Sequence, residues 1–318
     1  MLPIAIAVAL LTNRQVNSAQ SGQVHAAKAQ VLWRVFVGHK LEAFYPDRRR
    51  HRVLIAWLMT SSNPYSHDNP KADFRWVTRY GLRAFSAERQ VGGMFSGGHV
   101  DAPGSLLNID PEHSWAYFGL YDPMGSSYAT TWRERLGGRH FDGYPELKAT
   151  DKEVELAYSD NGRTTYRVAF PAHVDMDDPD AYVEVVKNQR VVQNVSIGRI
   201  PLNIFVAHGT GRFYAVYWDH LATLSGGKIK LPPVLQVNQY NSEQTGPNSR
   251  ADTDATGRYA YMISPEVAKV FKVSLRTGAI VSQRTLGFLP SFVAVDPGTQ
   301  CIYLNDRASQ VIVAIKLF

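Results

Sequence analysis

The sequence predicts an all-β fold, a six-bladed β-propeller of four-stranded antiparallel blades whose ring is closed by an N-terminal strand. Hydrophobic residues make up 45% of the 318 residues and aromatic residues 11%, a globular composition that favours strands over helices. A strand–turn–strand pattern recurs six times at a spacing of about 45 residues, which is enough for one four-stranded blade. Segments left over at both ends of the chain can complete the last blade.

The repeat is clearest in the segments that start at Asn203 (NIFVAHGTGRFYAV) and at Ser291 (SFVAVDPGTQCIYL). Each segment reads as an apolar strand, a turn rich in Gly, Pro or Asp, and a second strand, which is the chemistry of a hairpin. The six copies start at Glu42, Ser105, Val154, Asn203, Ser249 and Ser291. Unrelated hairpins in a β-sandwich are the alternative, but they do not account for the near-regular spacing.

The two ends of the chain fit a closed ring. After Ser291 there is room for two more strands, near 301–305 and 311–317, but not for a full blade. The segment VLWRVFV at 31–37 precedes the first repeat without a partner of its own. Pairing it with the last blade would cover two exposed strand edges. We therefore expect one propeller domain over 20–318 rather than the two domains that the length suggests.

The N-terminus carries a ten-residue apolar run, LPIAIAVALL at 2–11. Such a run is too short to cross a bilayer and has the length of a signal-peptide core. Small residues at 18 and 19 offer a cleavage point, so we expect a signal peptide over 1–19 and a secreted or secretory-pathway protein. A buried first strand or helix is the alternative. No transmembrane span is expected.

Charge and cysteine content exclude several classes of protein. The net charge is +6 and there is one cysteine, Cys301, so neither an internal disulfide nor a zinc finger can form. The only basic run, RRRHR at 48–52, is typical of a solvated turn, and we expect no nucleic-acid partner. Dinucleotide-binding, P-loop and nucleophile-elbow motifs are absent from the sequence. We therefore expect no redox cofactor.

The segments GRIPLNIFVAHGTGRFYAV (198–216) and GFLPSFVAVDPGTQCIYLND (287–306) resemble the repeat of YVTN-type and SMP-30/lactonase-like β-propellers. In these proteins a Gly-x-x-Pro loop leads into a strand that lines a central channel. The resemblance is good in the last third of the chain and poor between 58 and 190. It implies that the loops before the six inner strands open on one face, which we call the mouth.

The same resemblance raises the question of a metal ion. In SMP-30-like lactonases a Glu, an Asn and an Asp hold a divalent cation over the channel, and Glu42 and Asn203 match two of these positions. Ser249 stands where the Asp is expected, and Asp252 follows three residues later. Because a hard cation usually needs more than one carboxylate, we expect no metal ion. Binding by Glu42 and Asn203 is the alternative.

Acid–base groups are predicted to surround the mouth. His99 and Asp101 form the leading pair, because a carboxylate can orient and charge an imidazole and residues i and i+2 of an extended loop point the same way. The other catalytic candidates are Glu42, Arg199 and Asp219. The substrate-binding candidates are Asn203, Ser249, Arg250, Ser291, Ser105, Trp218, Phe288, Trp76, His173 and Tyr121. For each residue, a solvated loop position is the alternative.

Two segments rich in turn-forming residues, 57–81 and 122–147, are expected to be loop insertions. On a propeller mouth such insertions form either a wall of the pocket or surface decoration. The sequence does not choose between these two roles.

A polar rim around an apolar well favours acid–base chemistry on a small apolar organic molecule. The resemblance extends to fungal biosynthetic propellers of the cyclase type, and a cyclase mainly needs a cavity that holds a reactive conformer. We therefore expect a cyclase or isomerase of specialised metabolism, of the oxygen-ring-closing or hetero-Diels–Alder kind. A metal-dependent lactonase of the SMP-30 type and a non-catalytic binding or scaffold propeller are the alternatives.

Overall fold

The computed structural model describes the chain in fourteen segments. The strands 105–110, 115–122, 127–135 and 152–158 and a few other strand residues are described through their backbone alone. The segments are 27–41, 43–59, 71–84, 105–110, 115–122, 127–135, 152–158, 164–171, 181–187, 190–199, 201–207, 209–236, 250–264 and 266–318. These residues form strands and turns, together with one short 3-10 helix, η1 (Pro233–Leu235). In these segments no helix has the length and apolarity that crossing a membrane requires.

The strands in the described segments form six sheets, each built mainly from strands that follow one another along the chain and pair antiparallel. The first sheet contains β3 (Ala43–Asp47), β4 (Arg52–Met59), β5 (Lys71–Thr78) and β6 (Gly81–Ala84). The second contains β7 (Ser105–Asp110), β8 (Trp115–Asp122) and β9 (Ser127–Arg135). The third contains β10 (Lys152–Tyr158), β11 (Thr164–Pro171), β12 (Ala181–Lys187) and β13 (Arg190–Gly198).

The other three sheets follow the same scheme, and two of them gain a strand from the N-terminal part of the chain. The fourth sheet contains β14 (Asn203–Ala207), β15 (Arg212–Val216), β16 (His220–Thr223) and β17 (Lys228–Lys230). The fifth contains β18 (Ala251–Thr253), β19 (Tyr259–Ser264), β20 (Val267–Ser274) and β21 (Ile280–Thr285), together with β1 (Ala27–Lys28). The sixth contains β22 (Pro290–Asp296), β23 (Cys301–Asp306) and β24 (Val311–Lys316), together with β2 (Val31–Phe36).

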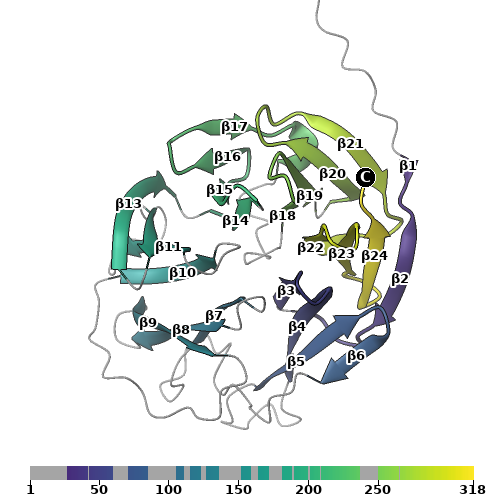
Figure 1. Ribbon diagram of the computed structural model, residues 1–318, viewed down its shortest axis with the longest axis horizontal. Helices are drawn as coiled ribbons and strands as arrows, with labels where there is room; N and C mark the ends of the chain where they lie inside the picture. Colours follow the sequence, from purple (N-terminus) through teal and green to yellow (C-terminus); the bar gives the residue numbers. More distant parts are fainter. Residues whose placement is uncertain are drawn as a thin grey trace, which may run out of the picture.

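The sheets are arranged around a common centre, with the first strand of each sheet innermost (Figure 1). These inner strands are β3, β7, β10, β14, β18 and β22, and each contacts the next, with β22 returning to β3. They start at residues 43, 105, 152, 203, 251 and 290, at or within two residues of the repeat starts predicted above. The repeat in the sequence therefore locates the inner strands.

One sheet joins the two ends of the described chain. Strand β2 pairs antiparallel with β24, with Arg34 opposite Val313 and Phe36 opposite Val311. The Val37 amide also donates to the Gln310 carbonyl at 2.9 Å. The predicted pairing of 31–37 with the last strands is thus confirmed, whereas the short parallel pairing of β1 with β21 was not predicted.

Apolar side chains fill the space between neighbouring sheets. Phe44 of β3 stacks on Phe292 of β22, with ring centroids 5.6 Å apart, and both lie in a cluster that includes Cys301 and Tyr303 of β23. Burial raises the pKa of the Cys301 thiol, so this cysteine stays protonated and is a packing residue.

The structure differs from the sequence analysis in the two segments expected to be loop insertions. Strand β5 occupies Lys71–Thr78 and pairs with β4, and β9 occupies Ser127–Arg135 and pairs with β8. The expectation of loops was wrong there, because pairing with a neighbouring strand outweighs the local turn propensity. Trp76 of β5 is buried, with the Arg52 guanidinium carbon 3.5 Å from the centroid of its ring.

Candidate functional site

The inner strands β14, β18 and β22 begin with buried polar side chains. Asn203 is the first residue of β14, Arg250 directly precedes β18, and Ser291 is the second residue of β22. All three side chains are buried. Because the three inner strands lie side by side, their starts form a described part of the predicted mouth.

Ser291 has a partner that the sequence analysis did not include. Asn305, near the end of β23, donates from Nδ2 to Ser291 Oγ at 2.7 Å. The Asn305 Oδ1 atom is buried and accepts no hydrogen bond within the described segments. Its position at the end of the strand beside β22 is the signal that could have identified it, since β23 ends where β22 begins.

Arg250 holds a guanidinium group inside the protein, with 4% of the residue exposed. Burial lowers the pKa of Arg250, and the charge of Glu266 partly offsets this effect. The Arg250 Nε atom has no acceptor among the residues that the structure describes. A buried guanidinium is costly unless its donors are used, so this group is a candidate ligand contact.

A second group of polar side chains follows β13 and β15. The Asp219 Oδ1 atom lies 2.6 Å from His220 Nδ1, and the imidazole stacks on Tyr217 with ring centroids 4.7 Å apart. Tyr217 donates from its hydroxyl to the Ile197 and Arg199 carbonyls, at 2.7 and 3.0 Å. Burial raises its pKa to about 12, so the hydroxyl remains a donor at neutral pH.

The arrangement around Asp219 can support proton transfer. The carboxylate holds Nδ1 of His220, which leaves Nε2 as the second nitrogen of an oriented imidazole. The Arg199 guanidinium carbon lies 5.5 Å from the centroid of the Trp218 ring. The predicted residues Arg199, Trp218 and Asp219 therefore lie together, and His220 completes the group.

The end of the inner strands remote from the mouth, where hairpin turns follow them, is called here the turn end. Arg48, in the turn after β3, donates to Asp252 Oδ2 at 2.7 Å and to the Val295 carbonyl at 2.9 Å. The Val295 amide donates to the same Asp252 oxygen at 2.7 Å. These bonds join β3, β18 and β22, so Asp252 serves as a cross-link between sheets.

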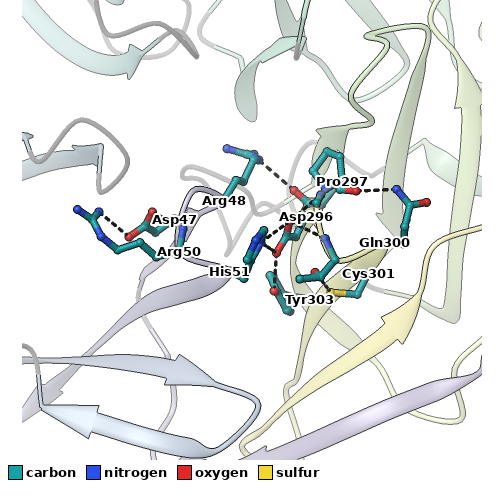
Figure 2. A network of polar contacts seen from close by, with 12 residues as sticks. Asp47, Arg48, Arg50, His51, Asp296, Pro297, Gln300, Cys301 and Tyr303 are labelled. Carbon is teal, nitrogen blue, oxygen red and sulfur yellow. Dashed lines mark hydrogen bonds and ion pairs between the residues drawn. The ribbon is translucent and has the colours of Figure 1, made fainter.

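Figure 2 shows a second cross-link at the turn end, centred on Asp296 of β22. Its buried carboxylate accepts a hydrogen bond from the Tyr303 hydroxyl at 2.8 Å and lies 3.0 Å from His51 Nδ1. Arg52 Nε donates to the buried Asp47 carboxylate at 2.9 Å. The basic run at 48–52 was expected to be a solvated turn, but Arg48, His51 and Arg52 each meet a buried carboxylate.

The remaining predicted site residues keep the status of predictions. Glu42, His99, Asp101, His173 and Ser249 lie outside the described residues. Ser105 and Tyr121 lie in β7 and β8, which are described through their backbone. Phe288 is half-buried before β22, and Trp76 lies in β5 under Arg52.

Comparison with known proteins shows similarity of fold. No family model and no curated protein matches the sequence. The chain is similar to a solved chain of hydrazine synthase from Kuenenia stuttgartiensis, at 14% identity over 87% of this chain and 83% of that one, with a TM-score of 0.50. It is also similar to the β-propeller domain of Cps50 (Swd1) from Myceliophteria thermophila, at 7% identity over 91% of this chain and all of that one, with a TM-score of 0.44. Likeness at these identities concerns the fold and says nothing of function.

Proposed function

We propose that the chain is a six-bladed β-propeller whose ring is closed by β2 on β24. The contacts between consecutive inner strands, from β3 round to β22 and back, support this architecture. The antiparallel register of β2 with β24 supports the closure, because a strand from one end of a chain that completes a sheet from the other end removes two exposed edges.

A disulfide between β2 and β24 would test the closure. Phe36 and Val311 are opposed in the register and neither is fully buried, so Phe36→Cys with Val311→Cys creates a suitable pair. A cross-link that encloses most of the chain is expected to raise the free energy of unfolding by about 4 kcal/mol in the oxidised form relative to the reduced form. Failure to oxidise, or no gain on oxidation, would argue against the closure.

For the mouth we propose a small-molecule enzyme that needs no redox cofactor, a cyclase or isomerase acting on a small apolar organic molecule. The observation that carries this proposal is the pair of buried atoms at the mouth without described partners, Arg250 Nε and Asn305 Oδ1. Buried polar groups are nearly always hydrogen-bonded. One donor and one acceptor left over at the start of the inner strands support binding of a ligand that has an oxygen and a hydroxyl group.

The chemistry of the mouth supports ring closure or isomerisation. A guanidinium in a dry site stabilises negative charge that develops on a carbonyl or alkoxide oxygen. The Asp219–His220 pair supplies a group that takes or returns a proton. The carboxylate of Asp252 pairs with Arg48, which supports chemistry that does not depend on a metal ion. The apolar run at 2–11 supports secretion.

Mass spectrometry of product mixtures tests this function. The purified chain is incubated with libraries of small lactones and of acyclic hydroxy ketones and hydroxy epoxides, with and without EDTA. A cyclase or isomerase gives a product with the elemental composition of its substrate, and EDTA leaves the rate unchanged. Addition of one water to a lactone, abolished by EDTA, would instead indicate the lactonase. Absence of any conversion in both libraries would count against an enzyme and favour a binding propeller.

A further inference from the structure

A pocket of about 690 Å³ lies between the sheet β14–β17 and the sheet β18–β21. Its lining includes Thr210 and Arg212 of one sheet, and Thr256, Arg258, Ser274 and Arg276 of the other. The three turns in this lining follow β14, β18 and β20. Two of them follow inner strands, so the pocket belongs to the turn end and not to the mouth. Its volume is within the range of small-molecule sites. We call it the arginine pocket.

Three arginines line this pocket, and none of them has an ion-pair partner within the described segments. Arg212, Arg258 and Arg276 are exposed, and none of them forms an ion pair with a described residue. No carboxylate stands among the lining residues. Asp254 lies beside the pocket, where its carboxylate accepts the Thr256 hydroxyl at 2.9 Å, so three positive charges adjoin one negative charge. Three like charges around one cavity repel one another, and an anion between them relieves this repulsion.

The turns hold the backbone of all three arginines in the same way. In each case the hydroxyl oxygen of the residue two positions earlier accepts a hydrogen bond from the backbone amide of the arginine. The distances are 3.4 Å for Thr210 to Arg212, 3.2 Å for Thr256 to Arg258 and 3.3 Å for Ser274 to Arg276. Such hydroxyl–backbone bonds define a compact turn. The three side chains therefore start from fixed positions around the pocket.

The three turns are also held against one another. The Leu275 amide donates to the Arg258 carbonyl at 2.9 Å, which joins two turns of one sheet. Across the gap between the sheets, a Cβ on Gly209 would lie 2.5 Å from the Ala255 carbonyl oxygen, so the β14–β15 turn touches the β18–β19 turn. Fixed turns lower the ordering cost of binding, because only the arginine side chains need to adjust.

We propose that the arginine pocket binds a small molecule that carries two or more tetrahedral oxyanion groups, phosphate or sulfate. Arginine presents a planar fork of N–H donors that matches such groups bidentately. Three guanidinium groups offer more N–H donors than the two oxygens of a single carboxylate can accept. The volume of the pocket has room for more than one phosphate group. This site is independent of the chemistry proposed for the mouth.

Calorimetric titration of the full chain in chloride buffer tests the proposal. Pyrophosphate is the phosphate probe, a heparin disaccharide is the sulfate probe, and citrate is the carboxylate control. We expect saturable one-to-one binding of at least one oxyanion probe, weakened but not abolished when the salt concentration is raised to about 0.15 M. The probe that binds more tightly identifies the source of the oxyanion. Absence of binding by both probes, or equally tight binding of citrate, would overturn the proposal.

Single substitutions locate the binding. Arg212→Gln, Arg258→Gln and Arg276→Gln are each expected to weaken binding about tenfold, the usual effect of losing a charge-assisted hydrogen bond. Arg258→Lys keeps the charge but loses the fork, so it should weaken binding less than Arg258→Gln. The matched control is Arg83→Gln, an exposed arginine of β6, which removes the same charge from a distant sheet and should leave affinity within twofold. An equal loss in the control would show that net charge alone, and not this pocket, attracts the anion.

Discussion

The mouth and the turn end use the same residue type in opposite ways. At the turn end, Arg48 meets Asp252 at 2.7 Å and also binds the Val295 carbonyl, so its charge is matched inside the protein. At the mouth, Arg250 is buried with an Nε donor that no described residue accepts. Burial of an arginine therefore does not assign its role. A carboxylate that bonds directly to the guanidinium does, because only a paired charge stabilises the fold that buries it.

The largest expected effect is at the turn end, on replacing Asp252 with alanine. This change leaves Arg48 without its carboxylate and the Val295 amide without its acceptor. The free energy of unfolding should fall by about 4 kcal/mol, as expected for a broken buried pair, measured by urea denaturation. The double variant Arg48→Met with Asp252→Leu should recover the part of this loss that comes from the unpaired guanidinium, but not the part that comes from the Val295 amide. A loss below about 1 kcal/mol in the single variant would refute the cross-link.

The same experiment at the mouth should give the opposite result for stability. Arg250→Met removes a charge that burial already disfavours, so the free energy of unfolding should change by less than about 1 kcal/mol. The rate of conversion of the substrate found in the library assay should fall about a hundredfold, as for the loss of an oxyanion donor. A stability loss as large as that of Asp252→Ala would show that Arg250 is structural.

Alkaline pH sharpens the comparison through Tyr217. Because its pKa is raised to about 12 in the folded protein from an ordinary value of about 10, the stability that it contributes is complete below pH 10. It is then lost as the pH rises towards 12. Tyr217→Phe should make the free energy of unfolding fall less steeply between these pH values. Buried Tyr45, Tyr261 and Tyr303 have raised pKa values too, so Tyr217→Phe should keep part of the pH dependence of the parent chain. Parallel curves for Tyr217→Phe and the parent chain would contradict the assignment.

The smallest expected effect belongs to an exposed member of the basic run. Arg50 contacts Asp47 at 3.2 Å, but half of its side chain is exposed. Exposed ion pairs contribute little to the stability of a folded protein. Arg50→Gln should therefore lower the free energy of unfolding by less than about 0.5 kcal/mol, as measured by urea denaturation. A loss approaching that of Asp252→Ala would mean that the number of charges, rather than their burial, stabilises the turn end.

Much of the fold could be predicted from the sequence, and less of the site. The starts of all six inner strands and the pairing of β2 with β24 follow from the repeat and from the leftover segments. Strand β5 was missed, because Pro and Asn residues before it indicate a loop while its strand character depends on pairing with β4. At the mouth, Arg250 and Ser291 were predicted as site residues from their place in the repeat, and the structure shows that both are buried. Asn305 was not, because its role depends on contact with β22.

The strands and turns of the repeat could be located from local sequence, because alternation of apolar residues and turn chemistry act between neighbours along the chain. Which charges are paired depends on how the sheets are arranged in the folded protein. Arg48 meets Asp252 across 204 positions of sequence, and His51 meets Asp296 across 245. Such partners come together only when the sheets pack around their common centre. The lining of the arginine pocket, in contrast, contains no carboxylate. The physical reason is that pairing of charges depends on distance in space, which a local pattern does not encode.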